Sequence, residues 1–100
     1  MVDLVKMFNF KIEIEVNDLY VIDKTSGHRQ RLGCFCTRYI CSDDADSAIS
    51  SAKSDVVNEL HIQGIECSAN QITIESTLRL YESPDLDETA GKGFTFYSYE

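Results

Sequence analysis

The sequence has no long apolar run: no segment of its 100 residues approaches the roughly 18 consecutive apolar residues that a membrane span requires. Its start, MVDLVKMFNF, also lacks the basic flank and long apolar stretch of a signal peptide. We therefore expect a cytoplasmic protein whose thiols stay reduced. The length suits a single domain, 1–100, with one modest core.

Basic residues are scarce. Nine Lys and Arg stand against 17 Asp and Glu, which gives a formal net charge of -8. Nucleic acids and anionic membranes are bound through Lys and Arg, so the charge excludes both as partners. The electric field of such a chain instead attracts basic partners. The alternative is that the acidity serves solubility alone.

Catalytic and cofactor motifs are absent as well. The sequence contains no C-x-x-C pair, Gly-rich phosphate loop, serine elbow or pair of catalytic carboxylates, so we predict no enzyme, no cofactor and no metal site. The cysteines and histidines are Cys34, Cys36, Cys41, Cys67, His28 and His61, and none has zinc-finger spacing. We predict that Cys34 and Cys36 are core residues, because free Cys is commonly buried. A Cys–His nucleophile pair remains an alternative, since such partners meet in space.

Period-two alternation and strand-forming composition predict four strands. They cover residues 6–16, 32–41, 71–81 and 94–99. The polar stretch 17–32 predicts a loop or wide hairpin turn, in which 19–22 either extends the first strand or forms a strand of its own. Residues 82–93, ESPDLDETAGKG, predict an acidic loop that holds the only proline.

The period changes to three and four residues over 43–62, which predicts an amphipathic helix. Ser42 or Asp43 is the expected N-cap, and Gly64 is placed to end the helix with a left-handed residue. We therefore predict an α+β fold of order β-β-α-β-β. Its antiparallel four-stranded sheet has one helix packed on one face, and the other face is left open.

Side-chain parity predicts which residues lie on the open face. They are Lys11, Glu13 and Glu15; Phe35, Thr37 and Tyr39; Thr73, Glu75, Thr77, Arg79 and Tyr81; and Thr95, Tyr97 and Tyr99. On the third strand, Ile72, Ile74, Leu78 and Leu80 are expected to face the helix. Tyrosines among acids are typical of a protein interface. Bases of single-stranded RNA stack on such faces only where the neighbours are basic, so the charge excludes RNA.

The layout resembles that of the small acidic bacterial immunity proteins encoded beside interbacterial toxins, such as those of contact-dependent growth inhibition systems. The likeness lies in size and charge, in the strand-to-helix unit CSDDADSAISSAKSDVVNELHIQGIE and in the terminal GFTFYSYE. It implies a cytoplasmic protein that binds one cognate protein toxin, expected to be basic and a nuclease, and blocks its active site or substrate cleft.

The residues themselves predict the contacts. The expected partner-binding set is Glu13, Glu15, Tyr39, Glu75, Tyr81, Asp85, Asp87, Glu88, Tyr97 and Tyr99. An alternative surface is the outer side of the helix, with Asp46, Lys53, Asp55 and Glu59. Two alternative functions are a structural or adaptor domain that homodimerises through its open sheet face, and a small-molecule-binding or catalytic domain that uses a cysteine.

Overall fold

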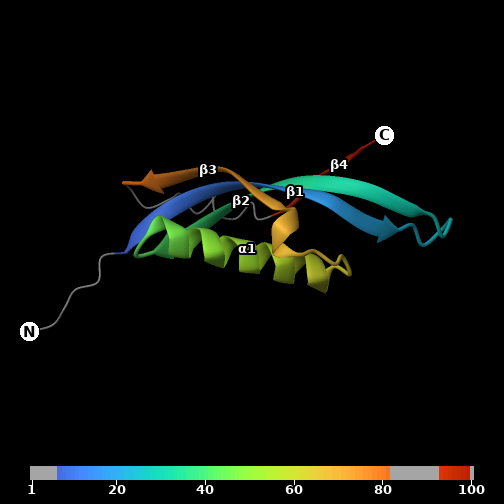
Figure 1. Cartoon of the computed structure of the whole chain (residues 1–100), viewed down its shortest axis with the longest axis horizontal. Helices are drawn as coiled ribbons and strands as arrows, with labels where there is room; N and C mark the ends of the chain where they lie inside the picture. The colour runs from blue at the N-terminus through green and yellow to red at the C-terminus, as the bar shows by residue number, and fades with distance from the viewer. Residues whose placement is uncertain (1–6, 82–92, 100) are drawn as a thin grey trace, which may run out of the picture.

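A four-stranded antiparallel sheet, with one helix across one of its faces, forms the framework of the protein (Figure 1). The computed structural model describes residues 7–81 and 93–99. In chain order the elements are β1 (Phe8–Ile22), β2 (Arg29–Ser42), α1 (Ala45–Ile62), the 3-10 helix η1 (Ala69–Gln71), β3 (Ile72–Leu80) and β4 (Thr95–Ser98). Across the sheet the order is β3-β1-β2-β4. The predicted α+β class and the element order are confirmed.

The β1–β2 hairpin is longer than the sequence predicted. β1 continues to Ile22 and β2 begins at Arg29, so the expected loop at 17–32 is reduced to a turn at 23–28. The Asp23 carboxylate accepts a 2.8 Å hydrogen bond from the Thr25 N–H in this turn. Gly27 occupies the left-handed region there, with φ 74°. Of the two alternatives for 19–22, extension of the first strand is the one observed.

A β-bulge in β1 makes this extension possible. Val16 pairs with Cys34 and Leu19 with Leu32, so β1 holds one more residue than β2 between the two pairs. Asp18 lies in the left-handed region at the bulge, with φ 59°. Val16 and Leu19 therefore both point to the helix side, and both are fully buried. The bulge shifts the alternation of side chains along β1 by one residue, so a prediction based on a strict period of two fails beyond Val16.

A second bulge lies in β3, at Glu75. Ile74 pairs with Ile14, whereas Ser76 pairs with Glu13, so β3 holds one extra residue there. The residues after the bulge change faces. Leu78 lies opposite Lys11 on the open side of the sheet and is 56% exposed. The prediction that Leu78 and its neighbour Leu80 face the helix is therefore wrong.

Helix α1 covers the other face. Asp44, rather than the predicted Ser42 or Asp43, is its N-cap, and the Asp44 carboxylate accepts a 2.7 Å hydrogen bond from the Ser47 N–H. Hydrogen bonds from the backbone and the side chain of Ser47 lower the pKa of Asp44. Gly64 follows the helix with φ 82°, as predicted, and its N–H donates to the carbonyl of His61.

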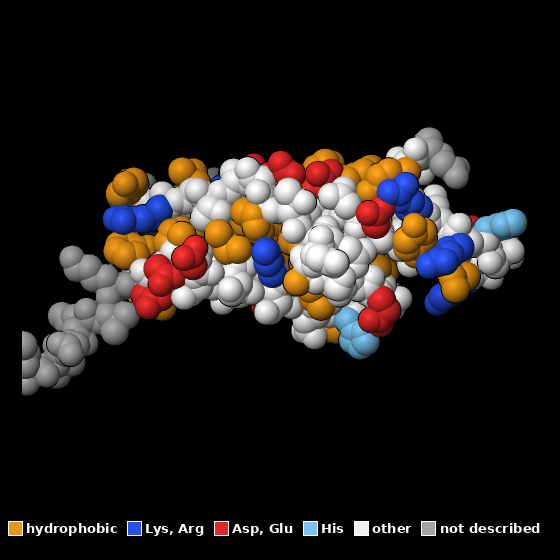
Figure 2. All heavy atoms as spheres, in the orientation of Figure 1, with side chains coloured by type: hydrophobic (Ala, Val, Ile, Leu, Met, Phe, Trp, Pro, Cys, Tyr) orange, Lys and Arg blue, Asp and Glu red, His pale blue; other side chains and the backbone are white. Residues whose placement is uncertain are grey.

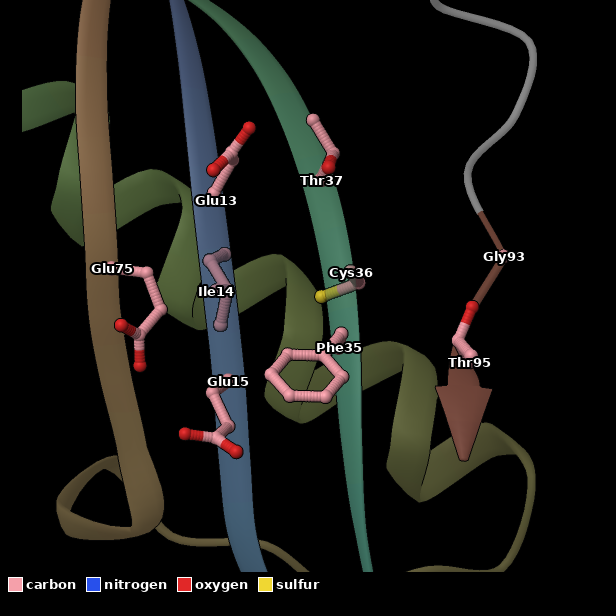
Figure 3. A pocket seen from close by; sticks show the side chains of 9 residues that line it. All are labelled: Glu13, Ile14, Glu15, Phe35, Cys36, Thr37, Glu75, Gly93 and Thr95. Carbon is pink, nitrogen blue, oxygen red and sulfur yellow. The ribbon is translucent and has the colours of Figure 1, made fainter. Parts of the chain in front are cut away.

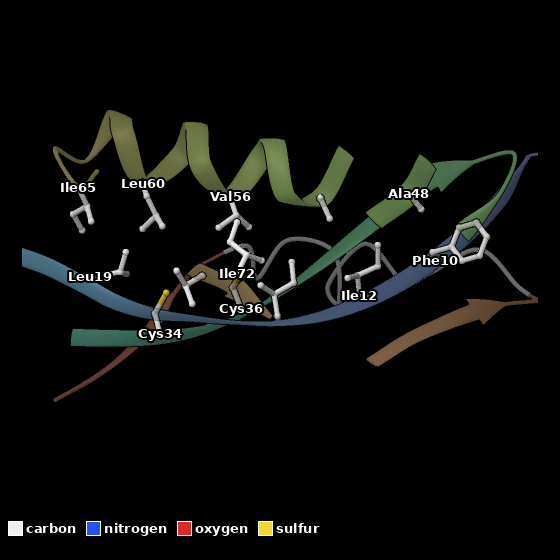
Figure 4. Close-up of a cluster of buried hydrophobic side chains, with 13 residues drawn as sticks. Phe10, Ile12, Leu19, Cys34, Cys36, Ala48, Val56, Leu60, Ile65 and Ile72 are labelled. Atoms are coloured by element: carbon white, nitrogen blue, oxygen red, sulfur yellow. The ribbon is translucent and has the colours of Figure 1, made fainter. Parts of the chain in front are cut away.

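The hydrophobic core lies between α1 and the sheet (Figure 4). Its members are Phe10, Ile12, Ile14, Val16, Leu19, Cys34, Cys36, Ala48, Ala52, Val56, Leu60, Ile65 and Ile72. The predicted burial of Cys34 and Cys36 is confirmed. The buried residues of α1 are small in its first half, Ala48 and Ala52, and larger in its second half, Val56 and Leu60.

Arg38 is a charged residue on the core side of β2, only 2% exposed. Its guanidinium pairs with the Glu59 carboxylate on α1 and donates a 2.9 Å hydrogen bond to the Thr37 carbonyl. The same group lies 5.0 Å from the ring centroid of Phe94. The pair ties helix to sheet. Glu59 is therefore not free on the outer surface of the helix, as the alternative binding surface required.

Candidate protein-binding face of the sheet

The face of the sheet opposite α1 carries most of the predicted contact residues, and we call it the open face. Cross-strand partners point to the same side, so the register identifies its members. They include Lys11 opposite Tyr39, Glu13 opposite Thr37, Glu15 opposite Phe35, Phe35 opposite Thr95, and Gly33 opposite Tyr97. Prediction and structure agree for these residues of β1, β2 and β4.

The β3 bulge changes which residues β3 contributes. Thr77 lies opposite Ile12, and Arg79 lies opposite Phe10, so both are on the helix side rather than on the open face as predicted. Arg79 stacks 4.0 Å from the ring centroid of Phe8 and 5.1 Å from that of Tyr81. Tyr81 thus lies beside Arg79 at the end of β3, 88% exposed, and apart from the aromatic residues of the open face.

Three carboxylates surround a hollow in the middle of the open face (Figure 3). Glu13 and Glu15 come from β1, and Glu75 comes from the bulge of β3. The hollow has a volume of about 460 Å³, and Phe35 forms part of its wall. Phe35 is 48% exposed, so an aromatic surface adjoins the carboxylates. We call this region, made of Glu13, Glu15, Glu75 and Phe35, the acidic hollow.

Glu15 also has a structural partner. It accepts a 2.5 Å hydrogen bond from the hydroxyl of Tyr97, which holds β4 in place. This bond is the largest cause of a raised Tyr97 pKa, followed by partial burial and by Tyr99. The Tyr97 ring packs 5.1 Å from that of Phe35 and lies over Gly33, where a Cβ would overlap it.

A polar network surrounds the β1 bulge next to Tyr97. The Asn17 side-chain oxygen accepts a 3.2 Å hydrogen bond from the Tyr99 hydroxyl, and the Tyr97 hydroxyl lies 3.2 Å from the same oxygen. The N–H of Asp18 donates to the Tyr99 hydroxyl at 3.1 Å, and the Asp18 carboxylate pairs with Arg31. The Arg31 guanidinium in turn lies 4.1 Å from the ring centroid of Tyr99. These contacts hold the Tyr99 side chain against the β1 bulge.

Asn17, Asp18, Arg31 and Gln71 escaped the sequence analysis. The Gln71 side chain donates to the carbonyl oxygens of Asn17 and Asp18, at 3.1 and 2.8 Å, and so satisfies the backbone that the bulge leaves unpaired. The only signal in the sequence was the pair Asn17–Asp18, two residue types that tolerate a left-handed backbone. That pair stood inside a stretch that we interpreted as loop.

The remaining predicted contact residues are less exposed than expected or fall outside the described part of the chain. Tyr39 is on the open face but partly buried beside Lys11. Asp85, Asp87 and Glu88 lie outside the described residues, so their prediction stays open. On the outer side of α1, Asp46 and Asp55 are exposed. With Glu59 paired to Arg38, this side carries fewer available carboxylates than predicted.

Three of the four cysteines lie where burial disfavours nucleophilic chemistry. Burial raises the pKa of Cys34 to about 12, and it also raises the pKa of Cys36 and Cys67. The reactive form is the thiolate, which these sites disfavour. Cys41 is exposed at the end of β2. Within residues 7–81 and 93–99, no group of three or more His, Cys, Asp or Glu side chains is arranged to hold a metal ion.

Comparisons with known proteins add no relative. The chain matches no protein-family model, no curated protein sequence and no solved structure. In the part of the chain that the structure describes, no helix combines the length and the apolar character needed to cross a membrane.

Proposed function

We propose that the chain is a cytoplasmic immunity protein, which binds a cognate interbacterial toxin and neutralises it. The observation that carries the proposal is the acidic hollow, where three carboxylates adjoin the exposed ring of Phe35 on a sheet face that no helix among residues 7–81 and 93–99 covers. A chain with a net charge of -8 is complementary to a basic protein surface. The expected toxin is a nuclease, because the substrate cleft of a nuclease is basic.

Inhibition would follow from occupying that cleft. Glu13 and Glu75 would pair with Lys and Arg that otherwise hold the phosphates of the substrate, and the electric field of the chain would speed the encounter. Phe35 and Tyr39 supply aromatic area for anchoring, the kind of residue that dominates interface energies. Tyr97 and Tyr99, predicted as anchors, act chiefly by keeping this surface rigid before binding, which lowers the entropy cost of association.

Co-expression with the toxin domain encoded beside the gene tests the proposal. We expect a complex that survives purification and blocks toxin activity. Reversal of two carboxylates, Glu13→Lys with Glu75→Lys, should weaken binding by roughly 100-fold, because both charges would then repel a basic cleft. The matched control is Asp46→Lys with Asp55→Lys on α1, which changes the net charge equally and should leave binding nearly intact.

Loss of affinity in the control alone would place the contact on the helix and contradict the proposed surface. If neither double variant affects binding, the remaining predicted carboxylates, Asp85, Asp87 and Glu88, are reversed next. Binding that persists through all of these reversals and through Phe35→Ala with Tyr39→Ala would overturn the open face as the inhibitory surface. A toxin that never forms a complex would overturn the immunity function.

A further inference from the structure

Charge is distributed unevenly along the β1–β2 hairpin. Residues 19–31, which we call the hairpin end, contain Lys24, Arg29 and Arg31 against a single acid, Asp23, and so carry a formal charge of +2. The whole chain carries -8. Figure 2 shows Lys and Arg side chains gathered at the hairpin end beside exposed apolar groups. The protein therefore has a basic end on an acidic body.

The hairpin end and the acidic hollow lie on the same face. Arg31 pairs with Tyr20 and Arg29 with Ile22, and the odd-numbered residues of β2 from 29 to 39 all point to the open side. Tyr20 is 46% exposed and Ile22 is 70% exposed. The Arg29 guanidinium lies 4.2 Å from the centroid of the Tyr20 ring. Among the described residues Arg29 forms no ion pair, so its charge is available to a partner.

This arrangement is self-complementary. From Glu15 to Ile22 the distance along β1 is about 23 Å, at roughly 3.3 Å per residue. A two-fold axis that lies in the plane between two facing sheets, perpendicular to the line joining the two regions and midway along it, would place the hairpin end of each copy over the acidic hollow of the other. Tyr99, fixed by its polar network, lies between the two regions, close to where that axis would pass.

We propose that the free protein associates with a second copy of itself, open face to open face, with Arg29 of each copy against Glu75 of the other. Tyr20 and Ile22 would pack against Phe35 of the facing copy, and their apolar area would leave water. The overlapping part of the face is about 25 Å long and two to four strands wide, which corresponds to roughly 1,000 Å² of total buried area. That size predicts a weak, reversible dimer.

The net charge of the chain opposes association, but only over long range. At an ionic strength of about 0.15 M the Debye length is about 8 Å, so distant charges are screened while contacting pairs persist. The dimer covers the acidic hollow. A basic partner and a second copy would therefore compete for one surface, although the inference does not require that the partner be a toxin.

Sedimentation equilibrium across the micromolar range at that ionic strength tests the dimer. We expect Arg29→Glu and Glu75→Lys, each made alone, to raise the dimer dissociation constant at least about tenfold. The reason is that each contact occurs twice in a two-fold symmetric dimer, so one substitution disrupts two ion pairs. An equimolar mixture of the two variants should associate again. In the mixed dimer, the Glu introduced at position 29 of one chain faces the Lys introduced at position 75 of the other. At the second, symmetry-related contact, the native Glu75 of the first chain faces the native Arg29 of the second.

Matched controls are Lys53→Glu and Asp55→Lys on α1, which repeat the two charge changes away from the open face. Circular dichroism and thermal melting confirm that every variant is folded. A monomeric native chain, a mixture that stays as dissociated as its components, or controls that weaken the dimer equally would each overturn the inference. A monomer that still binds a toxin would overturn this inference alone, and a dimer that binds none would overturn the immunity function alone.

Discussion

The hydroxyl of Tyr97 donates a 2.5 Å hydrogen bond to Oε2 of Glu15 and so joins the short edge strand β4 to the central strand β1, across β2. Hydrogen bonds to a charged acceptor are stronger than neutral ones. One of the carboxylates of the acidic hollow therefore also holds the sheet together. Charge reversal of Glu15 would change both the charge of the acidic hollow and the attachment of β4. Glu13 and Glu75 are therefore the better positions for a test of binding.

This bond predicts a pH dependence of stability at alkaline pH. The Tyr97 pKa is raised in the folded state above its ordinary 10.0, chiefly by the hydrogen bond to Glu15. The contribution of the protonated phenol is therefore complete below about pH 10 and is lost as the pH rises toward the folded value. Urea unfolding from about pH 8 upward should show the native free energy of unfolding falling more steeply than that of Tyr97→Phe. Equal slopes would contradict the pairing.

Gly33 predicts a steric effect on β4. A methyl group at this position would overlap the Tyr97 ring, so Gly33→Ala must displace the ring or strain the strand, at a cost of about 1–3 kcal/mol in the free energy of unfolding. In Tyr97→Ala the ring is gone, and the same glycine substitution should cost less. A double-mutant cycle measured by urea unfolding checks this. Additive effects would mean that the ring does not limit the space at Gly33.

The buried guanidinium of Arg38 predicts an asymmetry between its two partners. Glu59→Gln would leave the charge of Arg38 without a counterion and should destabilise the fold by about 1–3 kcal/mol. Arg38→Met removes the charge and fills similar space. In the Arg38→Met background, Glu59→Gln should therefore have little further effect. Thermal unfolding of the four chains gives the coupling energy, and a coupling near zero would refute the role of the pair.

Thiol labelling should separate the cysteines. At neutral pH we expect Cys41 to react first, because it is exposed, whereas Cys34 and Cys36 should react only after unfolding. Mass spectrometry of peptides after timed alkylation identifies each site. Rapid labelling of Cys34 in the folded protein would reopen the catalytic alternative, since it would show an accessible thiolate where burial should prevent one.

Much of the fold could be predicted from local pattern. The alternation from Phe8 to Val16 identified β1, and the steps of three and four residues identified α1 to within about two residues. Parity correctly assigned Cys34 and Cys36 to the core and Phe35 to the open face. These predictions hold because a regular strand or helix turns each residue by a constant angle, so sequence position alone sets the direction of the side chain.

Tertiary structure decided the rest at two bulges. One extra residue at Asn17–Asp18 joined Leu19–Ile22 to β1, and one at Glu75 moved Leu78 to the open face and Arg79 to the helix side. The bulge at Asn17–Asp18 is stabilised by distant partners, Gln71, Arg31 and Tyr99, which no local pattern encodes. The sequence by itself determined which segments form the strands and the helix, and which residue types they carry. Only the folded sheet decided which of those residues share a face, because its two bulges interrupt the period-two alternation of side chains.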